Sequence, residues 1–539
     1  MNIMPQNISA ESFPPFDPAM ASVYRYRQQQ SVNLGSWFVH ERWMTPSLFT
    51  CASGKRISEL DIASGWNSTD RARTVLEHHW NTFINQSDFQ YLSKIGINTV
   101  RLPIGYWSLG SEFCQGTPFS AFADVYRNSW ASVVRVINMA GAAGLGVLVD
   151  LHGAVGSQNG QPHSGISDKK TRLFNTPANM DKTLAVLTFL MQELCNVTNV
   201  VGIQILNEPT NVPTLDDFYT RAISTMRQMS NAAASFPLYI HDGFDLQRFS
   251  DFVASRTDFI VQDHHAYFVF TPSDTSEPAS KHTNDIQTTI SGSLAAACAH
   301  QRRNLVVDEF SCALTPQSLS NEPNEVKARQ DFCAAQVETY SNITAGWSFW
   351  AYKKEDCDDD SGWCFTAAVG TSLPSTFFSY GEGGNPAQSI GGSIDLPPIS
   401  DVLSNVEGSF ALPGQAKRTA LSSKLSRDWN FRRSISPFRH RLAAIHHRRS
   451  RRDPGLDMSA PQQSMTKGYS DGLLTAVLFA SCGMSKLGFS GQYIADNIKA
   501  LGPGVIAPGT ESQYSVGFMR GLVDGEKSIS STIIPTEDT

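Results

Sequence analysis

Short apolar runs alternate with longer amphipathic or polar segments along residues 32–350. This alternation is typical of repeated βα units, in which a buried parallel strand is followed by a helix. Eight runs are predicted to be strands: SVNLGSWF, NTVRLPIG, GVLVDLHG, VVGIQILNEP, FPLYIHD, FIVQDHHAY, NLVVDEFS and AGWSFWAY. Strands in this number, separated by gaps of helix length, predict an α/β fold of the closed (β/α)8 TIM-barrel type. No GxGxxG motif opens a first βα turn, which argues against an open doubly wound sheet.

The pattern changes beyond residue 370. Residues 371–423 are rich in Gly, Pro and Ser, which is typical of a loop or linker. Residues 424–460 form a basic linker with ten Lys or Arg, which fits a solvated tether, a nuclear signal or a patch for anionic surfaces. Apolar positions at helical spacing predict a small helical C-terminal region over residues 461–539. Residues 1–29 are then an N-terminal tail, and residues 30–370 form the barrel domain.

Composition and charge narrow the possible partners. The chain has 539 residues, of which 41% are hydrophobic and 17% charged, as in an ordinary soluble globular protein. Its net charge of -7 argues against nucleic acid, which would require a concentrated positive surface. The longest apolar stretch of the C-terminal region falls short of the about 20 residues that span a bilayer, so we expect no transmembrane segment. We also expect a monomer.

The cysteines and the N-terminal sequence bear on the compartment. The nine cysteines are scattered without CxxC or Cys/His clusters of zinc-type spacing, so we expect no metal and no cofactor. The N-terminal residues have neither a basic start nor an apolar core, so we expect no secretory signal. Both observations favour a cytoplasmic chain with free thiols, or export by an unusual route.

Polar side chains stand at the C-terminal ends of seven of the predicted strands. They are Arg101, His152, Asn207, Glu208, His241, Asp242, His265, Tyr267, Glu309 and Trp350. In a barrel of parallel strands these ends converge on one face, where the active site of this fold lies. A single buried carboxylate would more often belong to a structural ion pair, but its recurrence from strand to strand indicates a shared site.

Two of these residues, Glu208 and Glu309, are carboxylic acids that follow the fourth and seventh predicted strands. Hydrolysis of an acetal requires one carboxylic acid to protonate the departing oxygen and one carboxylate to attack or to activate water. Asn207 supplies an amide that could hold a sugar hydroxyl. Arg101 and Tyr267 are suited to hydrogen-bond the carboxylate of Glu309 and keep it ionised.

The other strand-end side chains fit a sugar site but also have structural interpretations. His152 and His265 offer donors for sugar hydroxyls, and Trp350 offers a flat apolar floor for a pyranose ring. Each histidine could equally be a satisfied structural group, and Trp350 could belong to the core.

The same stretches carry a family resemblance. The chain resembles, over about residues 30–370, the family 5 glycoside hydrolases, and most closely their fungal exo-β-1,3-glucanase branch (glucan 1,3-β-glucosidases). The resemblance rests on the segments NLGSWFVHERWMTPSLF, HHWNTFI, NTVRLPIGYW, VDLHGAVGSQNG, LNEP, DHHAYFVF, DEFSCALT and GWSFWAYKKED. It implies a (β/α)8 barrel and, in fungi, a role in glucan catabolism and cell-wall organisation, with relatives that are secreted or at the wall.

The resemblance also implies roles for individual residues. Glu208 would be the general acid/base and Glu309 the nucleophile of a retaining double displacement, with their carboxyl groups about 5 to 5.5 Å apart. The family's remaining active-site positions fall on Arg101, His152, Asn207, His265, Tyr267 and Trp350. Glu41 falls on a position that contacts the terminal sugar, and Phe270 on one half of an aromatic clamp at the entrance.

Three residues depart from the family pattern. Gln161 stands where a Phe is usual, so the second half of the clamp is missing on the leaving-group side. His163 stands where the family has an Asn that binds the terminal sugar, and we expect it to contact substrate. Asp308 stands where Gly is common, and a carboxylate so close to Glu309 is expected to raise its pKa unless a cation compensates.

The sequence therefore predicts a metal-free retaining β-glucosidase that removes glucose from the non-reducing end of β-1,3-glucan or short oligosaccharides. One alternative is action on another β-glucoside, such as β-1,6-glucan, a glycolipid or a small glycoside, which the altered segment 161–163 permits. Another is a glucan-binding barrel without catalytic activity, although such a module has no need of both Glu208 and Glu309.

Overall fold

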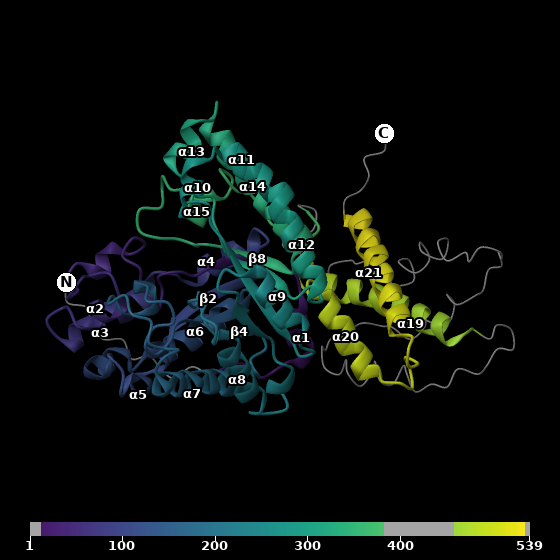
Figure 1. Cartoon of the computed structure of the whole chain (residues 1–539), viewed down its shortest axis with the longest axis horizontal. Helices are drawn as coiled ribbons and strands as arrows, with labels where there is room; N and C mark the ends of the chain where they lie inside the picture. Colours follow the sequence, from purple (N-terminus) through teal and green to yellow (C-terminus); the bar gives the residue numbers. More distant parts are fainter. Residues whose placement is uncertain (1–11, 382–457, 534–539) are drawn as a thin grey trace. The chain divides into compact units, whose positions relative to one another are not determined.

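The computed structural model describes residues 12–381 and 458–533 in two compact units (Figure 1). Among these residues, 12–17 and Tyr24–Phe377 belong to one unit, and Pro18–Val23, 378–381 and 458–533 belong to the other. The segment predicted as an N-terminal tail contains helix α1 (Pro18–Tyr26) and the first residue of strand β1. The predicted basic linker lies outside the described residues, apart from positions 458–460.

Eight parallel strands form a closed barrel in the first unit, in the order in which they occur along the chain. The strands are β1 (Gln29–Asn33), β2 (Thr99–Gly105), β3 (Gly146–Gly153), β4 (Val200–Gln204), β5 (Leu238–His241), β6 (Ile260–Ala266), β7 (Leu305–Phe310) and β8 (Gly346–Phe349). Each lies within or overlaps one of the apolar runs predicted to be a strand. Val32 of β1 pairs with Val100 of β2 on one side and with Phe349 of β8 on the other, which closes the ring. The predicted fold class is therefore confirmed.

Helices follow the strands around the barrel (Figure 1). The longer ones are α3 (Thr69–Thr82), α4 (Gln86–Lys94), α6 (Ser129–Ala142), α7 (Pro177–Leu194), α8 (Leu215–Arg227), α9 (Leu246–Ala254), α12 (Ser291–His300) and α14 (Glu325–Ile343). Shorter ones are α2 (Glu59–Ala63), α5 (Ser111–Cys114), α10 (Pro272–Ser276), α11 (Ala279–Asp285), α13 (Pro316–Ser320) and α15 (Phe365–Ala368). Side-chain caps define several starts: Asn324, for example, accepts a hydrogen bond from the Lys327 N–H at the head of α14.

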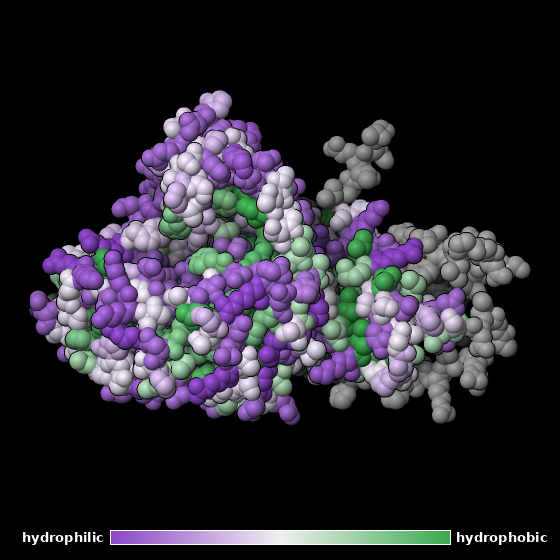
Figure 2. All heavy atoms as spheres, in the orientation of Figure 1, coloured by the Kyte–Doolittle hydropathy of each residue, from purple (hydrophilic) through white to green (hydrophobic). Residues whose placement is uncertain are grey.

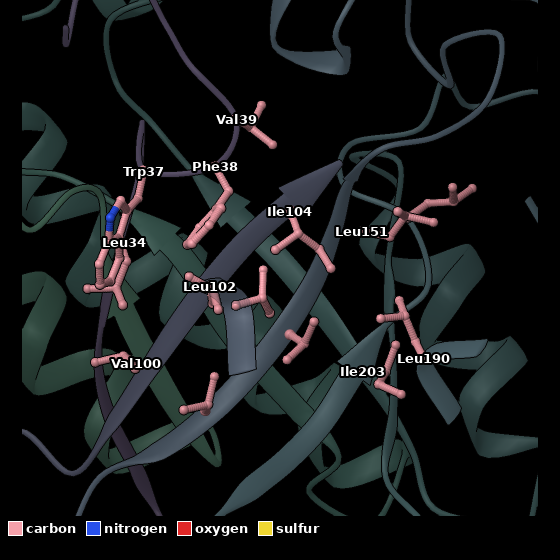
Figure 3. Close-up of a cluster of buried hydrophobic side chains, with 14 of the residues drawn as sticks. Leu34, Trp37, Phe38, Val39, Val100, Leu102, Ile104, Leu151, Leu190 and Ile203 are labelled. Carbon is pink, nitrogen blue, oxygen red and sulfur yellow. The ribbon is translucent and has the colours of Figure 1, made fainter. Parts of the chain in front are cut away.

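The alternation of side chains along β2 separates the core from the site. Val100, Leu102 and Ile104 are fully buried and belong to one apolar cluster with Leu151 and Leu190 (Figure 3). Because successive side chains of a strand point to opposite faces, the residues between them, including Arg101, point the other way. The core thus lies between the strands and the helices, while the barrel interior receives polar side chains. Hydrophilic side chains predominate on the outer face of the barrel unit shown in Figure 2.

The second unit contains helices α19 (Ala460–Ser481), α20 (Ser490–Leu501) and α21 (Glu511–Ile533). Helices α19 and α21 pack backbone against backbone, because both present glycines at the contact. A Cβ atom on Gly472 of α19 would lie 2.0 Å from the Phe518 carbonyl oxygen, and one on Gly521 of α21 would lie 2.0 Å from the Tyr469 carbonyl oxygen. Among the described residues, no helix combines the length and the apolar character that crossing a membrane requires.

Two disulfides correct the expectation of free thiols. Cys312 is bonded to Cys333, and Cys357 to Cys364. Cys312 follows β7 and Cys333 lies in α14, and the fold brings their Cα atoms to 5.2 Å although 21 positions separate them in sequence. Such a pair has no spacing signature, because the packing of the helix beside the strand creates it. The remaining cysteines are not disulfide-bonded: Cys51, Cys114, Cys195, Cys298 and Cys482.

Candidate active site

Glu208 lies just beyond β4, on a segment of backbone that its neighbours hold tightly. The Asn207 N–H donates to the Leu151 carbonyl at 3.2 Å, and the side-chain amide of Gln158 donates to the Asn207 carbonyl at 2.9 Å. Glu208 itself has φ of 42°, in the left-handed region. This conformation costs a residue other than glycine about 1–2 kcal/mol, and it persists where the surroundings impose it, often at functional sites.

Glu309, on β7, receives two hydrogen bonds from groups that can only donate to it. Nη1 of Arg101 donates to Oε1 at 2.8 Å, and the hydroxyl of Tyr267 donates to Oε2 at 2.7 Å. Glu309 is 4% exposed, and Arg101 is fully buried. The two contacts expected from the sequence are therefore both present.

Arg101 also contacts four other polar side chains inside the barrel. Its guanidinium donates to the side-chain oxygens of Gln204 at 2.8 Å, Asn33 at 2.9 Å and Asn207 at 2.7 Å. Its Nη2 lies 3.1 Å from Oδ2 of Asp150. Nε thus binds one side chain, and Nη1 and Nη2 each bind two, which fixes the position of the guanidinium and of the Glu309 carboxyl group.

A single imidazole nitrogen lies next to both candidate catalytic acids. Nδ1 of His265 lies 2.8 Å from Oε1 of Glu208 and 3.4 Å from Oε2 of Glu309. The separation of these two carboxyl oxygens cannot exceed the sum of the two distances. That sum is below about 6.5 Å, the smallest separation of carboxyl groups that is typical of inverting glycosidases. Nε2 of the same ring lies 2.9 Å from Oδ2 of Asp263, which orients the imidazole.

The pKa values of the two acids are shifted in opposite directions. Burial raises the pKa of Glu309, and the nearby Glu208 charge adds to the rise, while His265 and Arg101 oppose it. Burial acts in the same sense on Glu208, but the hydrogen bond and the positive charge of His265 outweigh it, and its pKa is lowered. The protonation of this pair therefore depends on where the proton of His265 resides.

Two histidines line the other side of Glu208. Nδ1 of His152 lies 2.7 Å from Oδ2 of Asp150, and its Nε2 lies 3.1 Å from Nδ1 of His163. Nε2 of His163 lies 3.9 Å from Oε2 of Glu208. Burial, followed by the charge of Arg101, lowers the pKa of His152 to about 3, and burial followed by His152 lowers that of His163 to about 4. Both rings are therefore neutral near pH 7.

Glu41 and a group of aromatic rings complete the mouth of the site. Oε2 of Glu41 accepts a hydrogen bond from the indole of Trp43 at 2.9 Å. Burial raises the pKa of Glu41 to about 7, and the charges of Glu309 and Glu208 add to the rise. Trp350 is 5% exposed and lies parallel to the His152 ring, with 5.7 Å between ring centroids. A cis peptide bond joins it to the next residue.

Phe270 lies at the exposed edge of this aromatic group. It is 73% exposed and lies 5.6 Å from the Tyr267 ring and 6.4 Å from the Trp363 ring, centroid to centroid. Gln161, at the other half of the expected clamp, is exposed as well. The Phe270 side therefore offers an aromatic surface, and position 161 offers an exposed amide.

Asp308 is buried and precedes Glu309 on β7. Burial, and next the charge of Asp263, raises the pKa of Asp308 well above its usual range. The cation that the sequence required near Glu309 is Arg101. Oδ2 of Asp308 has no hydrogen-bond partner among the described residues.

Several residues of the site were not selected from the sequence as site residues. Asp150 and Asp263 orient His152 and His265, and each precedes its histidine by two positions. Residues two apart on a strand share a face, so the Asp-x-His spacing in VDLH and QDHH was a usable signal. Phe244, 59% exposed and next to His241, and Trp363 also lie at the mouth. Nothing in their local sequence distinguishes them from core aromatics.

Glu208, His241 and His265 are also close enough to share a metal ion, with one potential ligand atom of each within 4.8 Å of the others. The hydrogen bonds argue against this use. Nδ1 of His241 accepts the Gly243 N–H at 2.9 Å, so the proton of the neutral ring resides on Nε2, and both nitrogens of His265 face carboxylates. The expectation of a metal-free site stays a prediction.

Several known proteins are similar to this chain in sequence. Residues 67–356 match the family model described as Cellulase (glycosyl hydrolase family 5). The chain is 37% identical over 339 residues to "Glucan 1,3-beta-glucosidase 3" of Schizosaccharomyces pombe, covering 61% of this chain and 70% of that protein. It is 29% identical over 391 residues to "Glucan 1,3-beta-glucosidase" of Kluyveromyces lactis, covering 62% of this chain and 86% of the relative.

A solved structure with a similar fold is that of a rutinosidase from Aspergillus niger. It has a TM-score of 0.50 and 17% sequence identity, and the match covers 64% of this chain and 96% of that one. At this identity the likeness concerns the fold alone.

Proposed function

The chain belongs to glycosyl hydrolase family 5 and is a glycosidase, and from this premise we propose that it releases glucose from β-1,3-glucan or short β-glucosides with retention of configuration. Glu309 is the nucleophile and Glu208 is the general acid/base. The observation that carries the proposal is the position of both carboxyl groups beside one nitrogen, Nδ1 of His265.

The donors around Glu309 suit a nucleophile. The guanidinium of Arg101 and the hydroxyl of Tyr267 both donate to its oxygens, and neither can accept a proton from it at neutral pH. Hydrogen bonds of this kind favour the ionised carboxylate over the acid. The same donors also hold the two oxygens in place, so that one lone pair can face the anomeric carbon of a bound sugar.

The partner of Glu208 suits an acid/base because its hydrogen bond can reverse. With Nε2–H of His265 donated to Asp263, Nδ1 either donates a proton to Glu208 or accepts one from it. Transfer of this proton across 2.8 Å converts the ionised Glu208 into the acid and His265 into the neutral ring. The lowered pKa of Glu208 then describes the resting state, and the acid form arises when the proton moves.

The reaction follows in two steps. Glu309 attacks the anomeric carbon while Glu208 protonates the departing glycosidic oxygen, which leaves a covalent glucosyl ester on Glu309. Glu208, now ionised, takes a proton from a water molecule that attacks the same carbon and breaks the ester. Each step inverts the anomeric centre, so the released glucose keeps the β configuration.

Substrate contacts are assigned by position. Glu41, His152, His163 and Asn207 face the sugar beside the acid pair, and Trp350 supplies an apolar floor. Phe270 provides a stacking surface for the group that leaves. Preference for a β-1,3 linkage is supported by the names of the two fungal relatives. Gln161 in place of a second aromatic wall favours a broader choice of leaving group, including β-1,6-linked glucose or a small aglycone.

The assignment of the nucleophile is tested with Glu309→Gln. We expect a fall in kcat of several orders of magnitude with glucan binding retained, because the amide neither attacks nor carries charge. Glu193→Gln, an exposed change on α7, is the matched control. A Glu309→Gln protein as active as its parent would overturn the proposal, and a barrel that binds glucan without turnover in the parent would establish the non-catalytic alternative.

The assignment of the acid/base is tested with Glu208→Ala and an activated aryl β-glucoside. Such a substrate forms the ester without protonation, but hydrolysis of the ester then lacks a base. Added azide needs no base and should restore turnover with β-glucosyl azide as the product. An α-linked product, or no response to azide, would contradict the assigned role. Release of glucose from β-1,3-, β-1,4- and β-1,6-linked oligomers by the parent settles the linkage.

A further inference from the structure

We propose that His163 is a positioning residue for the acid/base: its Nε2 accepts the acidic hydrogen of Glu208 and favours the protonated carboxyl group. The inference rests on the proposed function and deepens it. A chain of hydrogen bonds runs from Arg101 in the barrel interior toward Glu208. The donors and acceptors along this chain determine the tautomers of His152 and His163, and the inference follows from them.

The chain of hydrogen bonds begins at Arg101. Its Nη2 donates to Oδ1 of Asn207, so the amide nitrogen of Asn207 points to Nε2 of His152 at 3.3 Å and must donate to it. Nε2 of His152 is then the acceptor of a neutral ring, and its proton resides on Nδ1, which donates to Asp150. Burial keeps this ring neutral, as its low pKa shows.

The tautomer of His163 follows from that of His152. Because Nε2 of His152 only accepts, Nδ1 of His163 at 3.1 Å must donate to it. Nε2 of His163 therefore carries a lone pair, which accepts a long hydrogen bond from the side-chain amide of Asn159 at 3.4 Å and lies 3.9 Å from Oε2 of Glu208. An acceptor in this place has no favourable contact with an ionised Glu208, but it forms a hydrogen bond with the protonated one.

The distance of 3.9 Å is longer than a hydrogen bond, so the contact forms only when the Glu208 carboxyl group turns toward His163. Catalytic hydrogen bonds are often long without substrate and tighten in the complex. His265 delivers its proton to Oε1 of Glu208, and turning of the carboxyl group brings this hydrogen to Nε2 of His163. His265 thus supplies the proton, and His163 accepts a hydrogen bond from the protonated carboxyl group, which favours the acid form of Glu208.

Other titratable groups also act on this pair. His163 is influenced by His152, Asp150 and His265, and Glu208 is influenced by His265 and His241. Glu41 and Glu309 lie close enough for their charges to interact with that of Glu208. A change at position 163 that leaves these groups in place isolates the effect of the acceptor.

The test compares leaving groups. We measure kcat/KM from pH 4 to 9 for the parent, His163→Ala, His163→Phe and His163→Gln on two substrates. The first is a 2,4-dinitrophenyl β-glucoside, whose dinitrophenolate leaves without protonation. The second is an alkyl β-glucoside, whose alcohol leaves only when the acid protonates it. Parent activity on the activated glucoside, and its loss in Glu309→Gln, tests the proposed function separately from the role of His163.

We expect His163→Ala and His163→Phe to lose at least about tenfold more activity on the alkyl than on the dinitrophenyl glucoside. The alkaline limb of the alkyl profile should move about one pH unit lower, because the protonated Glu208 has lost its acceptor. His163→Gln should recover part of both effects, since its amide oxygen accepts. His300→Ala, which removes an exposed histidine of α12, should behave as the parent.

Equal losses on both substrates, or an unmoved alkaline limb, would overturn the proposal and leave His163 as a sugar-binding or structural group. The Phe variant fills the space of the ring without an acceptor. It therefore carries the test if His163→Ala fails to fold.

Discussion

Arg101 and Glu309 form an ion pair inside the barrel, with 2.8 Å between Nη1 and Oε1, where neither side chain has substantial access to water. Three further carboxyl groups, those of Asp150, Asp263 and Asp308, act on the same guanidinium. Isolated charges in such a place are costly, and one cation here offsets several acids. The pair therefore serves both the stability of the barrel and the charge of the nucleophile.

Removing Arg101 should destabilise the barrel as well as inactivate it. We expect Arg101→Ala to lower the free energy of unfolding by about 3–5 kcal/mol, because buried carboxylates lose their cation. Unfolding by urea at pH 7 measures this change. Arg221→Ala breaks an exposed pair with Asp181 and should cost less than about 1 kcal/mol. Similar losses in the two variants would contradict the role of Arg101 in balancing the interior charge.

Tyr267→Phe should change the pH dependence of activity in a defined direction. The hydroxyl of Tyr267 donates to the ionised Glu309, so its loss raises the pKa of Glu309 further above its usual range. As pH falls, Glu309 is then protonated sooner, and the acid limb of kcat/KM should move to higher pH. The rate at the optimum should fall about 10- to 100-fold.

Tyr340→Phe is the matched control for this experiment. It also removes a buried hydroxyl, one that donates to Gln336 at 3.2 Å on α14 and not to either acid. It should affect stability without moving the acid limb. A limb at the parent position in Tyr267→Phe would show that the hydroxyl does not stabilise the ionised nucleophile.

The strands of this fold could be predicted because each has a local sequence pattern typical of a buried strand. A run such as NLVVDEFS is apolar, rich in β-branched residues and flanked by polar segments, and these features survive without knowledge of any partner. The order of the strands followed from the helix-length gaps, since parallel neighbours require a crossover. Closure into a ring followed from their number.

The site could be predicted only in part, because strand ends identify side chains but not their partners. Glu208, Glu309 and Arg101 stand out as polar residues after apolar runs. His152 pairs with His163, and Cys312 with Cys333, because loops and helices distant in sequence pack beside the strand ends. No local pattern records such pairings, whereas the Asp-x-His spacing on β3 and β6 did record two of them.

The disulfide between Cys312 and Cys333 should stabilise the segment that follows the nucleophile. It joins the end of β7 to α14 and closes a loop of 21 positions, for which chain entropy gives about 3 kcal/mol. We expect Cys333→Ser to lower the unfolding midpoint by several degrees in calorimetry, while Cys51→Ser, at an exposed free thiol, leaves it unchanged. A midpoint equal to that of the parent would mean that packing of α14 alone holds this segment.

At the glycines between α19 and α21, we expect substitution by alanine to have the opposite effect from the one that helix propensity predicts. Alanine is a better helix former than glycine by up to about 1 kcal/mol, yet Gly472→Ala should destabilise the second unit. The new methyl group would lie 2.0 Å from the Phe518 carbonyl oxygen, which is backbone and cannot turn aside. Gly292→Ala, on α12 with no atom within 4 Å of the new Cβ, should be neutral or stabilising.

Hydrogen exchange of residues 460–533 measures the effect of Gly472→Ala. Glycosidase activity should stay at the parent level, because the proposed catalytic groups all belong to the barrel unit. Unchanged protection in Gly472→Ala would show that the two helices separate readily.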